Sequence, residues 1–219
     1  MFSGIAHRYD LLNLLLSLGQ DRRWRRRAAQ LTRLRPGQSG LDICTGTGAL
    51  AARLRARVGP QGRVVGLDLT EAMVAGARRR VAQVEFVVGD AVHLPFADDS
   101  FDAASMAFGL RNIADHQAAL AEMLRVLKPG GRAVILEFST VSRPLGPWYS
   151  LYNRTVIPVV ARLLLGRAGA YQYLTESIAA FPAPMVVSRW LRDAGFEGVR
   201  YHRLSLGIVA IHIGFKAHG

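Results

Sequence analysis

Two patterns of apolar and polar positions alternate along most of the chain. Short apolar runs rich in Val, Ile and Leu, bounded by Gly, Pro or Asp, predict buried strands at residues 40–44, 63–69, 84–90, 101–108 and 132–138. Apolar residues at helical spacing predict helices between them, at residues 49–58, 70–81 and 116–127. Strands that alternate with helices form right-handed βαβ units. We therefore expect an α/β fold with an open, mostly parallel sheet and helices on both faces.

The end of the chain departs from this alternation. Two further strands are predicted at residues 198–205 and 208–217, with only Leu206 and Gly207 between them. Because so short a connection cannot cross over a sheet, these strands must form an antiparallel hairpin. The 219 residues then make one domain, built on a Rossmann-like sheet of seven strands that ends in an antiparallel pair.

Two segments do not fit the strand and helix pattern. The first predicts an apolar helix at residues 10–18 and a basic helix at 21–34, with Asp21 as the N-cap of the basic helix. We expect residues 1–36 to form a helical lid, and residues 140–184 to form a helical substrate cap inserted before the last two strands. The inserted segment carries the aromatic residues Trp148, Tyr149, Tyr152, Tyr171, Tyr173 and Phe181.

The balance of charge is strongly basic, with a formal net charge of +12. Nearly all basic residues are arginines, because lysine occurs only at Lys128 and Lys216. Five arginines surround Trp24 in the predicted basic helix: Arg22, Arg23, Arg25, Arg26 and Arg27. This charge suits an anionic partner, such as nucleic acid, an acidic substrate or an anionic membrane face. A solvated surface combined with a compositional bias would give the same balance.

The number of cysteines and the length of the apolar runs indicate in which cellular compartment the protein is expected. Cys44 is the only cysteine, so no intramolecular disulfide can form, and a reducing, cytoplasmic compartment is the simpler interpretation. The first ten residues lack the pattern of a secretory signal. The most apolar later run, residues 156–166, is shorter than the roughly 20 apolar residues that span a membrane. We therefore expect a cytoplasmic protein that is at most peripheral to a membrane.

A glycine-containing loop follows the first predicted strand. Gly46 and Gly48 would let the backbone approach a ligand closely, and the helix that starts after them would offer free N–H groups. The run from Gly46 to Ala51 also satisfies the loose G-x-G-x-x-G/A pattern of dinucleotide sites. The loop therefore predicts a nucleotide-type site and leaves an NAD-dependent oxidoreductase open as an alternative.

Carboxylates stand at three successive predicted strands. Asp42 lies just before the loop, where it would hold the loop or meet a positively charged ligand. Asp68 ends the second strand, where a carboxylate can accept hydrogen bonds from ribose hydroxyls. Asp90, followed by Ala91, ends the third strand and can address an adenine amino group. One such Asp would be read as a turn residue, but three at successive strands favour a binding site.

Several strings carry a resemblance to a known family. Five of them are Gly89-Asp90-Ala91-Val92-His93-Leu94-Pro95-Phe96, Leu127-Lys128-Pro129-Gly130-Gly131, Phe108-Gly109-Leu110-Arg111-Asn112, Leu136-Glu137-Phe138-Ser139 and Gly207-Ile208-Val209-Ala210-Ile211-His212. With Tyr9-Asp10-Leu11-Leu12-Asn13 and Trp24-Arg25 near the start, the chain resembles the ubiquinone/menaquinone biosynthesis C-methyltransferases from about residue 2 to 216. These are class I S-adenosylmethionine-dependent methyltransferases.

The resemblance implies a seven-stranded methyltransferase sheet and methylation of a ring carbon of a polyprenylated quinol by S-adenosylmethionine, without a metal. Conversion of demethylmenaquinol to menaquinol is the preferred reaction. A benzoquinol of ubiquinone biosynthesis and another small molecule are the alternatives. The NAD-dependent oxidoreductase is disfavoured, because the chain shows no Tyr-x-x-x-Lys pair and hardly any lysine.

The resemblance also implies site residues. The cofactor contacts carried over by position are Thr47, Asp68, Asp90, Ala91 and Ala107. The family often has Ser at position 107, so only a backbone contact is expected from Ala107. The loop residues Gly46 and Gly48, together with Asp42, complete the expected cofactor site.

The expected catalytic residues are Arg111, Asn112 and Tyr9. Arg111 and Asn112 follow the fourth strand, beside the expected position of the methyl group. Arg111 would stabilise a phenolate or orient a water that takes the proton. Tyr9 would approach from the lid. His116 and His202 are candidate bases by chemistry alone, and Cys44 is expected to be a packed residue rather than a nucleophile.

The expected partners follow from the substrate. A prenylated quinol resides in the bilayer, so we expect the basic helix to contact anionic headgroups peripherally. Nucleic acid is not expected, because the three acidic strand ends would repel phosphate. A homodimer stays open.

Overall fold

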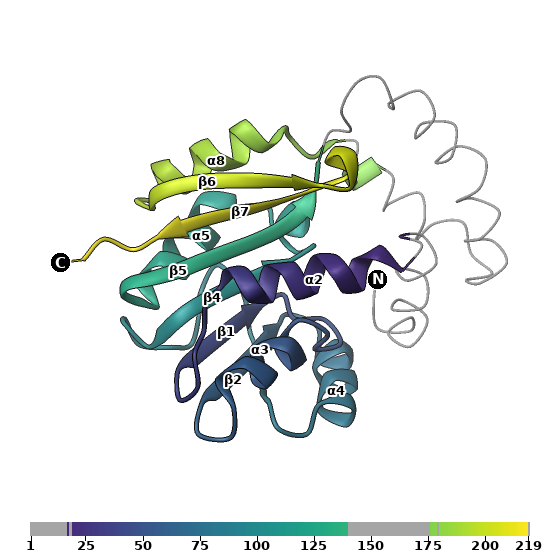
Figure 1. The fold of residues 1–219 in the computed structure, drawn as a ribbon, viewed down its shortest axis with the longest axis vertical. Coiled ribbons are helices and arrows are strands. Elements are labelled where there is room, and N and C mark those ends of the chain that lie inside the picture. The colour runs from purple at the N-terminus through teal and green to yellow at the C-terminus, as the bar shows by residue number, and fades with distance from the viewer. Residues whose placement is uncertain (1–16, 18, 140–175, 179, 219) are drawn as a thin grey trace, which may run out of the picture.

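The computed structural model describes residues 17, 19–139, 176–178 and 180–218. Seven strands form one sheet in the order β3-β2-β1-β4-β5-β7-β6 (Figure 1). The strands are β1 Ser39–Ile43, β2 Arg63–Asp68, β3 Glu85–Val88, β4 Phe101–Ala107, β5 Leu127–Phe138, β6 Glu197–Leu204 and β7 Val209–Phe215. β7 pairs antiparallel with both β5 and β6, and the other pairs are parallel. The predicted seven-stranded sheet with an antiparallel C-terminal hairpin is confirmed.

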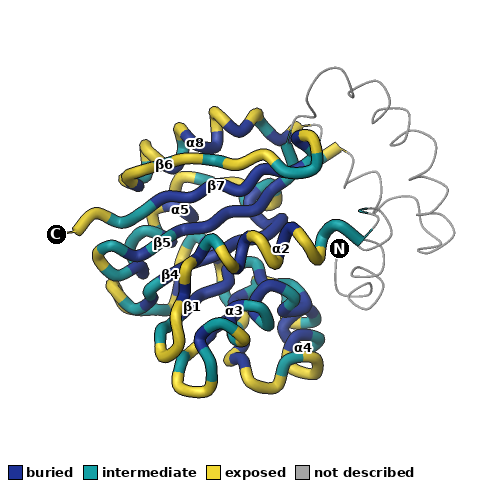
Figure 2. The backbone as a smooth tube through the Cα atoms, in the orientation of Figure 1, coloured by how far each residue is buried: buried dark blue, intermediate teal, exposed yellow. Residues whose placement is uncertain are grey.

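Helices cover both faces of the sheet. They are α2 Gln20–Leu31, α3 Ala51–Val58, α4 Glu71–Arg80, α5 His116–Arg125 and α8 Pro184–Asp193. One apolar cluster holds Trp24, Leu54 and Val74 and lies under α2, α3 and α4. A second cluster holds Leu120 and Val187 and lies under α5 and α8. Figure 2 shows the strands at the centre of the sheet buried between these two layers.

The basic helix begins earlier than its expected cap. α2 starts at Gln20, after Gly19, whose φ of 76° only glycine adopts easily. Asp21 therefore lies in the first helical turn, and the expectation that it is the N-cap is wrong. Its carboxylate instead faces Arg25 one turn later, with 3.8 Å between Oδ2 and Nε.

α2 is packed into the folded core. The Trp24 and Ala28 side chains are buried against the sheet, and the Trp24 indole Nε1 donates to Ser205 Oγ over 2.8 Å. Ser205 in turn donates to Gln20 Oε1, so the helix is tied to the turn between β6 and β7. Within the predicted lid, residues 20–31 thus form a layer of the core, while residues 1–16 lie outside the described residues.

Two elements differ from the sequence expectation. β5 begins at Leu127 rather than at residue 132, and its register against β4 shifts between Phe101 and Ala103. α8 was not predicted, although Pro184 opens it in the way typical of a first helical turn. Most of the predicted insertion at 140–184, including Trp148, Tyr149 and Tyr152, lies outside the described residues.

A buried histidine makes stability depend on pH. His212 on β7 faces Ser188 on α8, with 3.3 Å between Nδ1 and Oγ, and burial lowers the pKa of His212 to about 4. Between pH 4 and 6.5 the unfolded chain therefore binds a proton that the folded chain does not, so this histidine lowers stability as the pH falls through that window. We expect the stability advantage of the wild type over His212→Gln to shrink by about 3 kcal/mol from pH 6.5 to 4.

Urea unfolding at a series of pH values measures this difference. Burial raises the pKa of Asp42 to about 6, which acts in the opposite direction, but Asp42 is present in both proteins and cancels in the comparison. A difference that stays constant from pH 6.5 to 4 would contradict the assignment.

Candidate active site

A pocket of about 470 Å³ lies where β1, β2, β3 and β4 end. This volume is in the range of small-molecule sites, roughly 300–1,000 Å³. Its walls come from the loop after β1, the ends of β2 and β3, the start of α4, the end of β4 with the residues after it, and one residue of α2. A crevice at the carboxyl ends of parallel strands is the expected ligand position in an open α/β sheet.

The glycine loop is fixed from two sides. The Gly46 amide donates to Asp68 Oδ2 over 2.8 Å, and the Thr45 amide donates to the Leu67 carbonyl over 2.9 Å. Gly46 has a φ of 57°, and a Cβ added there would meet no atom within 4 Å. Its backbone therefore borders open pocket space, which leaves room for the predicted approach of a ligand. Thr47 also lines the pocket, and its hydroxyl accepts from Arg80 Nη1 over 3.3 Å.

Gly48 plays a different part from the one expected. It is not among the residues that line the pocket. A Cβ at this position would lie 2.8 Å from Cζ of Phe86, and the φ of Gly48 is 79°. Glycine is thus needed here so that the loop can pack on the Phe86 ring of β3 and take a left-handed turn.

Asp42 lies beneath the loop rather than on the pocket wall. It is 1 % exposed, and its carboxylate accepts from the Ser105 hydroxyl and from the Thr45 hydroxyl, both over 2.7 Å. Burial raises the pKa of Asp42 to about 6, while these two hydrogen bonds lower it. Of the two roles considered for Asp42, the structure shows the first, which is to hold the loop against β4.

The other two acidic residues, Asp68 and Asp90, both line the pocket. Asp68 accepts from the Gly46 amide with Oδ2 and from the Thr70 amide with Oδ1, over 2.8 and 2.9 Å. Two fixed donors orient this carboxylate without using all its acceptor capacity, so it can still accept from a ligand hydroxyl. Asp90 is exposed, and its Oδ1 accepts from the Val92 amide over 3.1 Å. Leu69, which follows Asp68 in the chain and is 69 % exposed, adds an apolar surface to the pocket.

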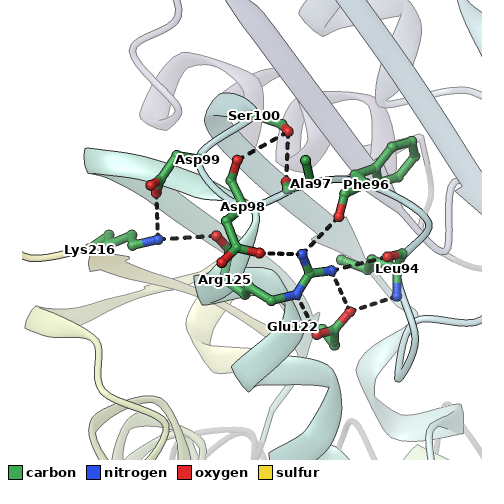
Figure 3. A network of polar contacts seen from close by, with 9 residues as sticks. All are labelled: Leu94, Phe96, Ala97, Asp98, Asp99, Ser100, Glu122, Arg125 and Lys216. Carbon is green, nitrogen blue, oxygen red and sulfur yellow. Dashed lines mark hydrogen bonds and ion pairs between the residues drawn. The ribbon is translucent and has the colours of Figure 1, made fainter.

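The loop that continues from Ala91 and Val92 is clamped from α5. The Arg125 guanidinium pairs with Glu122 and Asp98, at 2.7 Å in each case, and donates to the carbonyls of Leu94 and Phe96 (Figure 3). Glu122 also accepts from the Leu94 amide over 2.7 Å. Four polar groups thus surround one arginine–glutamate pair: the amide and carbonyl of Leu94, the carbonyl of Phe96 and the carboxylate of Asp98. They hold the loop that continues from the pocket wall at Ala91 and Val92.

The residues after β4 form the remaining wall. Ala107 lines the pocket with a methyl group and backbone, so it offers no side-chain hydrogen bond. Phe108 follows with a φ of 60°, and its amide donates to the Leu136 carbonyl over 2.8 Å. Asn112, in the short helix η1 (Leu110–Asn112), lines the pocket, as does Asp115, which caps α5 by accepting from the Ala118 amide.

The Arg111 side chain is buried in an ion pair beside the pocket-lining residues of this segment. Its side chain is 3 % exposed and pairs with Glu137, which is 0 % exposed, over 2.8 Å between Nη1 and Oε1. Nη1 also donates to the Phe108 carbonyl, and the Arg111 amide donates to Glu137 Oε2 over 3.3 Å. Arg111 therefore fixes η1 and the backbone of Phe108 to β5, and it is not among the residues that line this pocket.

Of the four remaining candidates, two histidines lie apart from the pocket, Cys44 lines it and Tyr9 is outside the described residues. His116 opens α5 and stacks on Trp190, with ring centroids 4.4 Å apart, while His202 is exposed on β6. Neither lines the pocket. Cys44 does line it, but burial, followed by the charges of nearby carboxylates, raises the pKa of its thiol, so it is no thiolate nucleophile. Tyr9 is outside the described residues.

Two charged residues of the pocket, Arg25 and Asp115, were missed as site residues from the sequence. Arg25 was grouped with the surface arginines, although it follows Trp24 and lies on the buried side of α2. Asp115 carries the N-cap signal of α5, three residues before Ala118, but nothing in that signal points to a pocket. Within the described residues, no group of three or more His, Cys, Asp or Glu gathers that could hold a metal ion. Among the same residues, no helix is long and apolar enough to cross a membrane.

The fold and the pocket together define an S-adenosylmethionine-dependent methyltransferase. A solved structure of such an enzyme from Thermotoga maritima, described as a possible histamine N-methyltransferase, is 26% identical to this chain. The two superpose with a TM-score of 0.66 over 98% of this chain and 97% of that chain.

The family is narrower than the fold. Residues 1–216 match the ubiE/COQ5 methyltransferase family, and the chain belongs to this family. A demethylmenaquinone methyltransferase from Thermus thermophilus is 48% identical over 98% of this chain and 99% of its own length. A ubiquinone/menaquinone biosynthesis C-methyltransferase from Ectopseudomonas mendocina is 43% identical over 99% of this chain and 87% of its own length. The resemblance inferred from the sequence is confirmed.

Proposed function

We propose that this enzyme methylates a ring carbon of demethylmenaquinol and produces menaquinol, with S-adenosylmethionine as methyl donor. The observation that carries the proposal is the pocket, in which a glycine loop and the carboxylates of Asp68 and Asp90 follow three adjacent parallel strands. The 48% identity to a relative named demethylmenaquinone methyltransferase supports the choice of substrate. The benzoquinol of ubiquinone biosynthesis is the alternative, since a relative at 43% identity carries both names.

The donor fits the order of the strands. S-adenosylmethionine supplies a methyl group on a positively charged sulfonium. Asp90 and Ala91 at the end of β3 would receive the adenine, and Asp68 at the end of β2 would accept from the ribose hydroxyls. Gly46 and Thr47 would contact the sulfonium side from β1, and Ala107 would do so with its backbone from β4. Leu69 would lie against the adenine ring.

The reaction is a direct displacement. A quinol hydroxyl next to the target carbon loses its proton, the ring carbon attacks the methyl carbon in line, and the carbon–sulfur bond breaks to leave S-adenosylhomocysteine. The ring carbon then releases its proton, which restores the aromatic ring. Because charge is lost in the transition state, a site that excludes water speeds the step. Positioning of carbon and methyl at near-attack distance supplies much of the remaining acceleration.

The acceptor would be oriented by the segment after β4. Asn112 offers an amide to the quinol oxygen, and Asp115 offers a carboxylate that can take the proton. Arg111 would act as a positioning residue, because its pair with Glu137 fixes the short helix that carries Asn112. Tyr9 stays a predicted contributor from residues 1–36.

Methyl transfer from labelled S-adenosylmethionine tests the proposal. The purified enzyme is incubated with demethylmenaquinol and, separately, with the corresponding demethylated benzoquinol, both in detergent micelles. We expect label in the naphthoquinol product at a rate at least tenfold above that of the benzoquinol. A faster benzoquinol reaction would move the enzyme to ubiquinone biosynthesis, and transfer to neither would refute a quinol substrate.

We also propose that the enzyme contacts an anionic membrane through α2. Arg22, Arg23, Arg26 and Arg27 are exposed on this helix, whereas Arg25 is buried and is removed from the set predicted to face headgroups. Arg53 on α3 is close enough to this helix to be affected by its charge, since burial and then the charges of Arg26 and Arg25 lower the pKa of Arg53. A prenylated substrate that resides in the bilayer requires such a contact.

Liposome co-sedimentation measures this contact. An arginine near an anionic surface contributes about 1 kcal/mol, so Arg22→Gln with Arg26→Gln is expected to weaken binding to anionic vesicles roughly 10-fold or more. The matched control, Arg189→Gln with Arg192→Gln, removes the same charge from α8 on the other face and is expected to change binding less than about threefold. Equal binding of the wild type to neutral and anionic vesicles would rule out the electrostatic contact. Analytical ultracentrifugation tests separately whether the enzyme forms a homodimer, which the sequence leaves open.

A further inference from the structure

Arg25 is a buried cation on the pocket wall. It is 8 % exposed, whereas its neighbours Arg22, Arg23, Arg26 and Arg27 on α2 are exposed. Its guanidinium lies over the ring of Phe108, with the central carbon 5.1 Å from the ring centroid, and the residue lines the pocket. Burial of a charged side chain costs free energy unless a partner compensates for the lost hydration, so Arg25 calls for such a partner.

The partners that the described residues supply are incomplete. Asp21 is the ion-pair partner of Arg25 in this part of the chain, but 3.8 Å separates Nε from Oδ2, which is longer than a hydrogen bond. Nε is buried and has no hydrogen-bond partner among the described residues. Asp42 is close enough for the Arg25 charge to lower its pKa, yet its oxygens already accept from Ser105 and Thr45. Among the described residues, the guanidinium is therefore held in place without a hydrogen-bonded anion.

The order of the strands tells which end of a ligand Arg25 would meet. Asp90 follows β3 and Asp68 ends β2, and the sheet then continues through β1 to β4. Phe108, on which Arg25 lies, directly follows β4, at the far end of the pocket from Asp90. A donor with its adenine at β3 and its ribose at β2 places its methionine part at β1 and β4. The carboxylate of that part is the single anionic group of the donor.

We propose that Arg25 binds the carboxylate of the methionine end of S-adenosylmethionine. The assignment rests on the proposed donor. A planar guanidinium can form two parallel hydrogen bonds with a carboxylate, which gives orientation as well as affinity. The quinol end of the pocket is marked instead by Asn112 and Asp115, which lie next to α5 on the other face of the sheet. The basic helix thus contributes Arg25 to the donor site, while its exposed arginines face outward.

Calorimetry with two ligands tests the assignment. One ligand is S-adenosylhomocysteine, and the other is its analogue that lacks only the carboxylate, 5′-deoxy-5′-(3-aminopropylthio)adenosine. We expect the wild type to bind S-adenosylhomocysteine roughly 10- to 100-fold more tightly than the analogue, the effect of losing charge-assisted hydrogen bonds. Arg25→Met is expected to lose this preference through weaker binding of S-adenosylhomocysteine, with little change for the analogue. Arg26→Met, one residue further on the same helix and exposed, is expected to keep it.

Each of the other possible results of the calorimetry contradicts a particular step of the assignment of Arg25. A wild type that binds both ligands equally contradicts the carboxylate contact without recourse to any variant. Arg25→Met weakening both ligands alike would assign Arg25 a merely structural role, and unchanged binding of S-adenosylhomocysteine would exclude the contact. If the wild type binds neither the analogue nor S-adenosylhomocysteine, the proposed donor itself is refuted. Thermal unfolding of the variants confirms that each is folded before it is titrated.

Discussion

Replacing Asp68 with alanine is expected to weaken binding of S-adenosylhomocysteine by about 100-fold or more. The carboxylate holds two amides, those of Gly46 and Thr70, so its loss releases the glycine loop from β2 as well as removing the acceptor for ribose hydroxyls. A hydrogen bond to a charged group contributes about 1.5–3 kcal/mol, and at least two are lost together. Isothermal titration calorimetry gives the two affinities directly.

The matched control for this change is Asp90→Ala. Asp90 is exposed and its side chain accepts from a single amide, that of Val92, so its removal disturbs the pocket wall less. We expect a loss in affinity smaller than that of Asp68→Ala, and an intermediate loss for Asp68→Asn, which keeps one acceptor oxygen. A folded Asp68→Ala protein that binds within threefold of the wild type would show that the ribose does not lie at β2.

Replacing Arg111 with methionine is expected to lower the free energy of unfolding by about 3–5 kcal/mol. The change leaves Glu137 as a fully buried carboxylate that has lost its ion-pair partner, which is far more costly than removing both charges. The double variant Arg111→Met with Glu137→Met is therefore expected to be more stable than the single variant. Urea unfolding of the three proteins measures this, and a single variant within 1 kcal/mol of the wild type would contradict a tight buried pair.

The double variant also separates the effect of Arg111 on donor binding from its effect on turnover. Because Arg111 fixes the short helix that carries Asn112, we expect the double variant to bind S-adenosylhomocysteine with little change while kcat falls by two orders of magnitude or more. Lost donor binding with unchanged turnover of saturated enzyme would show that Arg111 serves the donor instead.

The strands that build the site could be predicted because a buried parallel strand consists of a short run of apolar residues, which is visible in the sequence. Apolar runs bounded by Gly and Asp located β1, β2 and β4, and parallel strands bring their carboxyl ends to one edge. The meeting of Gly46 with Asp68 follows from that rule alone. α8 shows the limit, because its buried residues Pro184, Val187, Ser188 and Leu191 do have helical spacing, but the irregular aromatic segment before them hides where the period starts.

The positions of individual side chains depended on packing that no local pattern contains. Gly48 was expected to approach the ligand, but it makes room for the Phe86 ring from a different strand. Arg111 is joined to Glu137 by the pairing of β4 with β5, where Ala107 lies opposite Leu136. Arg25 was counted with solvated arginines because of its charge, whereas its place on the helix beside Trp24 decides that it is buried. Tertiary contacts overrode residue type in all three cases.

The orientation of the donor can be tested by solving the structure of the enzyme with S-adenosylhomocysteine bound. We expect the adenine to lie beside Ala91 and Leu69, and the ribose hydroxyls to lie within hydrogen-bond distance of Asp68. We expect the carboxylate of the ligand to bind Arg25. A ligand that binds in the reverse direction, or outside the pocket between Gly46 and Asp90, would contradict the assignment of this edge of the sheet as the methyl-donor site.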